Sequence, residues 1–285
     1  MVLRYFRRYA LIALLFSFSF TSASAWRLHE SIIKGDAAQI KRLLSKGADI
    51  NARDKKGRTA LHWATTGGNT KTVKLLLTQG ADINARDNKG QSALHDAAWN
   101  GNANMVKLLL SQGANIHARN NDGQTALHRA TSSWDIGNTN TKTIKLLLAK
   151  GVDVRAKDDD GETALHKAAY KGNTGAIKLL LSQGIDVNTK TKDGETALHD
   201  ATWSGNTKTV KLLLSRGADV NAKTKDGITA MHAASRNGHI DAIKLLLAKG
   251  ADINIKDNKE KMALYYARKN GQKATVLLLQ KHGAK

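Results

Sequence analysis

A glycine recurs along the chain at an almost constant interval of 33 residues. The one longer interval is 38 residues, between Gly113 and Gly151. Self-similarity at periods of roughly 20–50 residues is typical of repeat architectures, in which each unit buries its apolar face only by stacking on its neighbours. The sequence therefore predicts eight copies of one small unit. The recurring positions are Gly47, Gly80, Gly113, Gly151, Gly184, Gly217, Gly250 and Gly283.

Local patterns around each glycine predict two helices per unit. A Leu-rich stretch precedes the glycine, and its apolar residues, such as Val73, Leu76 and Leu77, are spaced as one stripe of a helix. The glycine then stands where the helix ends and a left-handed backbone is favoured. After a short polar hairpin, a Thr/Ser-Ala-Leu/Met-His tetrad provides a capping hydroxyl at the start of another helix. These tetrads begin at Thr59, Ser92, Thr125, Thr163, Thr196 and Thr229.

Units that start with D-x-x-G-x-T-A-L-H and end with L-L-L-x-x-G-A-D-I-N-A resemble ankyrin repeats. The resemblance covers Trp26 to Lys285. It implies an all-α solenoid of eight stacked repeats, each a helix-turn-helix with a β-hairpin loop. The family's usual Thr-Pro-Leu-His is Thr-Ala-Leu-His here, and Ala is a good helix former, so the fold is still expected. The expected repeats are 26–53 (N-terminal cap), 54–86, 87–119, 120–157, 158–190, 191–223, 224–256 and 257–285 (C-terminal cap, with Glu260 in place of the hairpin Gly).

The fourth repeat carries five extra residues within the segment from Ser132 to Asn140, between its two helices. Insertions in repeat proteins fall in surface loops because the stacked core has no room for them. A tolerated loop extension is the favoured interpretation. A binding contact through Trp134 stays open as the alternative.

Residues 1–25 have the features of a secretory signal peptide. Three arginines lie among the first eight residues, Ala10 to Phe20 is an uncharged apolar run, and Ala23-Ser24-Ala25 has the small-x-small pattern of a cleavage site. The apolar run is shorter than the roughly 20 residues of a membrane-spanning helix, so a permanent anchor is less favoured. We expect an exported protein, periplasmic or secreted, that starts at Trp26 and has no transmembrane segment.

The sequence contains no recognisable catalytic or cofactor site. There is no Cys, and the motifs of phosphate-binding loops, serine hydrolases and zinc proteases do not occur. The segment Asp158–Glu162 does not match a calcium loop, because Ala156 and Lys167 would stand at ligand positions. We therefore expect no enzyme activity, no cofactor and no metal. Seven histidines fall on one repeat position, and the resemblance implies that they hydrogen-bond within and between repeats: His29, His62, His95, His128, His166, His199 and His232.

The chain has a large excess of basic residues, and many of them recur at fixed positions of the repeat. It has 45 Lys+Arg against 24 Asp+Glu. The residue before each hairpin is basic seven times, and we call this set the hairpin column: Arg53, Arg86, Arg119, Lys157, Lys190, Lys223 and Lys256. A second set, the second-helix column, is expected on the opposite, convex side: Lys41, Lys74, Lys107, Lys145, Lys178, Lys211 and Lys244. Trp99, Tyr170 and Trp203 share one position late in the first helix.

The resemblance implies that the hairpins and first helices border a concave binding surface. Exposed aromatic residues among cations are typical of binding surfaces, although a Trp ring can also simply cover its own repeat. We predict a monomer that binds an acidic protein. The alternative is attachment to an anionic surface or polymer, such as an envelope glycolipid; nucleic acid is not favoured. The predicted contacts are Arg53, Arg58, Arg86, Trp99, Arg119, Lys157, Tyr170, Lys190, Lys192, Trp203, Lys223 and Lys225.

Overall fold

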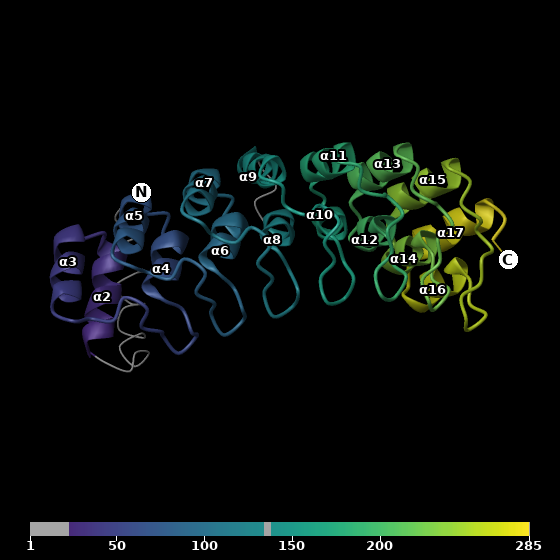
Figure 1. Ribbon diagram of the computed structural model, residues 1–285. Helices are drawn as coiled ribbons and strands as arrows, with labels where there is room; N and C mark the ends of the chain where they lie inside the picture. Colours follow the sequence, from purple (N-terminus) through teal and green to yellow (C-terminus); the bar gives the residue numbers. More distant parts are fainter. Residues whose placement is uncertain (1–22, 134–137, 285) are drawn as a thin grey trace. The chain divides into compact units, whose positions relative to one another are not determined.

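The computed structural model describes residues 23–133 and 138–284, and over these ranges the chain forms sixteen α-helices and no β-strand (Figure 1). The chain divides into two compact units, residues 1–126 and 127–285. The first unit contains α2 (Ala23–Lys34), α3 (Ala37–Ser45), α4 (Ala60–Thr66), α5 (Thr70–Thr78), α6 (Ala93–Trp99) and α7 (Ala103–Ser111). Helix α8 (Ala126–Ser132) begins at the boundary. The second unit continues with α9 (Asn138–Ala149), α10 (Ala164–Lys171), α11 (Thr174–Ser182), α12 (Ala197–Trp203), α13 (Thr207–Ser215), α14 (Ala230–Asn237), α15 (Ile240–Ala248), α16 (Ala263–Lys269) and α17 (Lys273–Lys281).

Helices within each unit stack in two layers. In the second unit, α10, α12, α14 and α16 pack side by side, and α11, α13, α15 and α17 form the layer beside them (Figure 1). Buried leucine and isoleucine side chains of the second helices, such as Ile177 and Leu180, fill the space between the layers. Fully buried alanines in the first helices, such as Ala168 and Ala169, let neighbouring helices approach closely. The expected all-α architecture of stacked repeats is confirmed.

The periodic glycines end the second helices in the left-handed conformation, as expected. Gly151, for example, has φ of 80°. A Cβ atom built on it would meet nothing within 4 Å. Glycine is therefore required there by the backbone conformation and not by a lack of space.

The hairpin glycines have a different reason to be glycine. Gly161 has φ of 79°, and a Cβ atom on it would lie 2.7 Å from the backbone nitrogen of Lys192, which donates a hydrogen bond to the carbonyl of Asp160. Successive hairpins are thus bonded through their backbones and leave no room for a side chain. Glu260 occupies the equivalent position of the last hairpin with φ of 58°. No further hairpin follows it in the described chain, so its side chain has space.

The five extra residues of the fourth repeat are not simply a loop. Helix α9 has 12 residues, three more than the other second helices, and begins at Asn138. The expectation of a surface loop is therefore wrong for residues 138–140, which form the first turn of α9. Asn140 is buried, which is consistent with its place inside a helix. The predicted contact of Trp134 lies outside the described residues, and so does most of the predicted signal peptide, residues 1–22.

Candidate protein-binding surface

The repeated histidines connect successive repeats through hydrogen bonds of their ring nitrogens. In the second unit, the backbone N–H of Thr196 donates to Nδ1 of His199 at 3.2 Å, so the proton of the neutral ring is on Nε2. That Nε2–H donates to the carbonyl of Ile228 in the next repeat at 3.1 Å. Burial is the main cause that lowers the pKa of His199 to about 4. The predicted structural role of these imidazoles is confirmed for His62, His95, His128, His166, His199 and His232.

Several members of the hairpin column also hold repeats together. The ammonium group of Lys157 donates to the carbonyl of Lys190 at 2.9 Å, and that of Lys190 donates to the carbonyl of Lys223 at 3.1 Å. In the first unit, the guanidinium of Arg53 donates to the carbonyl of Arg86. These side chains are exposed. Each Lys therefore has further N–H groups that face solvent, but a change at these positions also alters the stack.

Arg58 lies in a cluster of the first unit and not on an open surface. Its guanidinium forms an ion pair with Asp54 at 3.0 Å and stacks 3.5 Å from the ring centre of Trp63. The ring of His29 also contacts Trp63, edge to face, with the ring centroids 4.3 Å apart. Because Arg58 is only partly exposed, its contacts indicate a role in closing the N-terminal end of the repeat stack.

The three aromatic residues at the equivalent position differ in exposure. Each is the seventh residue of its first helix. Tyr170 is 48% exposed and Trp203 is 45% exposed, whereas Trp99 of the first unit is half-buried. Tyr170 and Trp203 are the two aromatic side chains that remain available to a partner at this position.

Tyr170 and Trp203 line one pocket of about 730 Å³ in the second unit, which we call the acidic pocket. It is bordered by the hairpins that precede α10, α12, α14 and α16 and by the first helices themselves. Of the predicted contacts, the pocket brings together Tyr170, Trp203 and Lys225, while Lys157, Lys190, Lys192 and Lys223 lie outside its lining. Its lining residues are Glu162, Tyr170, Asp193, Glu195, His199, Asp200, Trp203, Thr224, Lys225, Asp226, Ile228, His232, Ala233, Arg236, Asp257, Asn258, Lys259 and Tyr266.

Carboxyl groups are the most numerous charged groups in the lining of the pocket. Burial and the nearby charges of Glu162 and Glu195 raise the pKa of Asp200 well above its usual range. The Oδ2 atom of Asp200 is buried and accepts no hydrogen bond from the part of the chain that the structure describes. The sequence analysis did not identify Asp200, although the sequence contains a signal. The tetrad that ends in the repeat histidine is nearly constant, whereas the next position varies and is acidic at Asp96 and Asp200.

A scan against protein families finds the ankyrin repeat model in three copies, which match residues 28–120, 135–224 and 219–285. This chain belongs to the ankyrin-repeat family. No curated protein matches the ankyrin-repeat chain as a whole or in part. Ankyrin repeats are generally protein–protein interaction modules and are typically non-catalytic. None of the helices in the described ranges of this ankyrin-repeat protein is both long and apolar enough to cross a membrane.

One group of carboxylates in the ankyrin repeats has a spacing that a metal ion could use. Oxygen atoms of Asp158, Asp160 and Glu162 can lie within 4.8 Å of one another. The ammonium of Lys167 is paired with both Asp158, at 3.0 Å, and Glu162. Asp158 also accepts the backbone N–H groups of Asp160 and Glu162. These contacts hold the hairpin together, as the sequence predicted, and the ammonium of Lys167 offsets part of the negative charge of the group.

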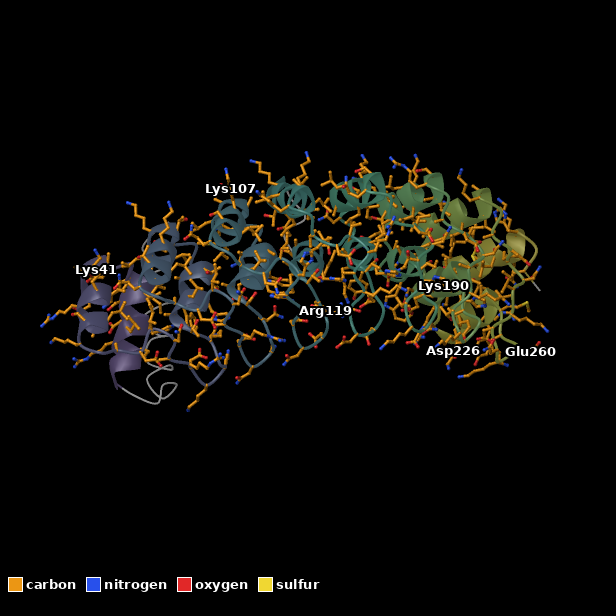
Figure 2. All side chains as sticks on the ribbon, in the orientation of Figure 1. Lys41, Lys107, Arg119, Lys190, Asp226 and Glu260 are labelled. Carbon is orange, nitrogen blue, oxygen red and sulfur yellow. The ribbon has the colours of Figure 1, made fainter. Side chains whose placement is uncertain are left out.

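The second-helix column and the hairpins lie on different sides of the repeats. Lys107 lies on the outer side of α7, away from α6, whereas Asp226 and Glu260 lie on hairpins (Figure 2). All seven members of the second-helix column are exposed. They are a matched set of cations that do not line the acidic pocket, and they therefore serve as controls for the contacts proposed below.

Proposed function

We propose that this ankyrin-repeat protein binds an acidic protein partner through the hairpins and first helices of its second unit. The observation that carries the proposal is the wide exposure of Tyr170 and Trp203 on first helices whose neighbouring hairpins carry the exposed lysines Lys192, Lys225 and Lys259. Large exposed aromatic side chains are the residues that most often carry binding energy when a partner covers them. The excess of 45 basic over 24 acidic residues attracts acidic partners at long range.

Charge reversal on the two sides of the repeats tests this proposal. The hairpin triple Lys192→Glu, Lys225→Glu and Lys259→Glu uses exposed lysines whose side chains make no hydrogen bond to the neighbouring repeat among the described contacts. Lys157, Lys190 and Lys223 are less suitable because they bond the repeats together. The matched control is Lys145→Glu, Lys178→Glu and Lys211→Glu on the second helices, with the same change in net charge.

The partner is captured with the chain from Trp26 onward and then titrated against both triples. The hairpin triple is expected to weaken binding by about tenfold or more, because local charge contacts are lost, while the control loses only a long-range term that salt screens. Trp203→Ala is expected to weaken binding as well. Equal losses for both triples would contradict local contacts and favour the alternative, attachment to an anionic surface or polymer whose affinity follows total charge and falls steeply with salt.

We also propose that the protein is exported to the periplasm or beyond the cell and that residues 1–25 direct this export. The proposal rests on the basic flank, the apolar run and the small residues before Trp26. Mass spectrometry of protein exported by its native route is expected to find Trp26 at the N-terminus. Recovery of intact Met1 from the exported fraction would refute it.

A further inference from the structure

We propose that the acidic pocket of the second unit binds a basic side chain, lysine or arginine, that a protein partner inserts between Trp203 and the carboxylates of Glu162, Glu195 and Asp200. This inference rests on the proposed function and adds the chemistry of one contact to it. The partner is then acidic over much of its surface and carries at least one basic side chain at the centre of the contact.

The charge of the pocket is opposite to that of the chain. Six carboxyl groups line it, from Glu162, Asp193, Glu195, Asp200, Asp226 and Asp257, against three cations, from Lys225, Arg236 and Lys259. The carboxyl groups outnumber the cations even without Asp200, whose raised pKa favours its neutral form. The whole chain has nearly twice as many basic as acidic residues. The two imidazoles in the lining, of His199 and His232, are neutral at physiological pH because burial lowers their pKa. A pocket of this composition attracts a cation at short range.

Asp200 supplies a hydrogen-bond acceptor without a donor. It projects from α12 beside Glu162 and Glu195, which belong to the hairpins before α10 and α12, so three separate elements place carboxylates together. Its Oδ2 atom is buried and accepts no hydrogen bond from the described residues. Buried polar atoms are nearly always bonded, so an unbonded carboxylate oxygen on a residue that lines a pocket indicates a missing donor.

The neighbouring carboxylates repel one another. Burial, then Glu162 and Asp193, raise the pKa of Glu195, and burial, then Glu162 and Glu195, raise that of Asp200. The charge of Lys167 acts to lower the pKa of Asp200, but its ammonium is bonded to Asp158 and Glu162. A guanidinium or ammonium from a partner would reduce the repulsion and supply the N–H donors that Asp200 lacks.

The aromatic walls fit the same ligand. The guanidinium of Arg236 lies 5.2 Å from the ring centre of Trp203, and the ammonium of Lys171 lies 5.5 Å from that of Tyr170, so cations already approach both rings. Aromatic rings also pack against the aliphatic stems of lysine and arginine. The pocket volume of about 730 Å³ exceeds that of one side chain. It has space for the basic side chain together with the adjoining peptide.

Titration with a peptide probe tests the inference independently of any natural partner. The probe is a capped pentapeptide of Gly and Ser with a central Arg, compared with the same peptide carrying uncharged citrulline, an isostere of Arg, and with a Lys version. The readout is the indole N–H signal of Trp203 in the ¹⁵N-labelled protein, assigned with Trp203→Phe. We expect saturable shifts with the Arg or Lys peptide at a dissociation constant on the order of 1 mM, and binding at least about fivefold weaker for citrulline.

Matched variants locate the contact. Asp200→Asn and Glu195→Gln, each isosteric, are expected to weaken Arg-peptide binding by about fivefold or more. Asp96→Asn, at the equivalent repeat position in the first unit, is expected to leave it unchanged. Circular dichroism confirms that each variant is folded. No saturable shift, equal binding of the citrulline peptide, or equal effects of Asp96→Asn and Asp200→Asn would overturn the inference. Any of these results leaves the proposed function standing if the captured partner still depends on the hairpin lysines.

Discussion

The carboxylate of Asp200 costs the fold stability because its Oδ2 atom is buried without a hydrogen bond. An uncompensated buried charge is retained in proteins mainly where it has a task other than stability. The lysines of the hairpin column show the opposite case, since Lys157 and Lys190 are exposed cations that also support the stack by donating to carbonyl groups of the next repeat. Charged residues of this chain therefore differ in their effect on folding: Asp200 lowers the stability of the fold, whereas Lys157 and Lys190 support the stack.

We predict that Asp200→Asn raises the free energy of unfolding by about 1 kcal/mol near neutral pH. The raised pKa of Asp200 means that ionisation is harder in the folded than in the unfolded state, so the carboxylate destabilises the fold increasingly as pH rises above its ordinary range near 4. Urea denaturation at several pH values measures this, and the gain is expected to vanish in acid. The control is Asp241→Asn, whose side chain is 75% exposed. A loss of stability for Asp200→Asn near neutral pH would contradict the assignment of an unbonded carboxylate.

At the scale of elements, repetition made the helices, the turns and the hairpins predictable from sequence. One leucine stripe or one glycine is a weak signal, but the same signals at a constant interval identify the element and its end. The extra segment of the fourth repeat occurs once, so no comparison between repeats shows that residues 138–140 extend α9. The acidic pocket could not be predicted either, because it depends on which side chains from four repeats converge. Glu162, Glu195 and Asp200 stand at positions that vary from one repeat to the next, so the repeat pattern does not single them out.

Gly151→Val tests the end of α9 and is expected to lower the free energy of unfolding by roughly 1–3 kcal/mol. The strain comes from the backbone alone, since φ is 80° and a Cβ atom would meet nothing within 4 Å. Gly151→Asn is the control, because asparagine adopts the left-handed conformation more readily than a β-branched residue. The loss is expected to be smaller for Asn than for Val in chemical denaturation. Equal losses of stability for the two variants would indicate that the added side chain is too large for the site and that the backbone angle is not the cause.

For the whole molecule, the net charge of +21 and the acidic pocket act over different distances. Net charge affects how often an acidic partner arrives, and it is screened beyond roughly 8–10 Å at physiological salt. Contacts inside the pocket act only after arrival and select partners with a basic side chain at the right place. A surface of one sign with a pocket of the other therefore gives both fast association and specificity.

Buried histidines make the stability of the fold sensitive to acid. Burial lowers the pKa values of His62 and His232, and it lowers those of His166 and His199 to about 4, so between about pH 6.5 and 4 the unfolded chain binds protons that the folded chain does not. Stability is therefore expected to fall as pH decreases through this window, by up to about 3 kcal/mol for each of His166 and His199. Glu195 and Asp200 oppose the fall because their pKa values are raised.

Denaturation between neutral pH and about pH 4 measures the balance of these groups. His166→Gln and His199→Gln are the matched variants, since each removes one titrating imidazole while Gln keeps a polar side chain. Both variants are expected to be less stable than the parent near neutral pH, because the bond to the next repeat is altered. Their stability is expected to fall less steeply in acid. A pH profile as steep as that of the parent would show that these two histidines are not the groups that take up the protons.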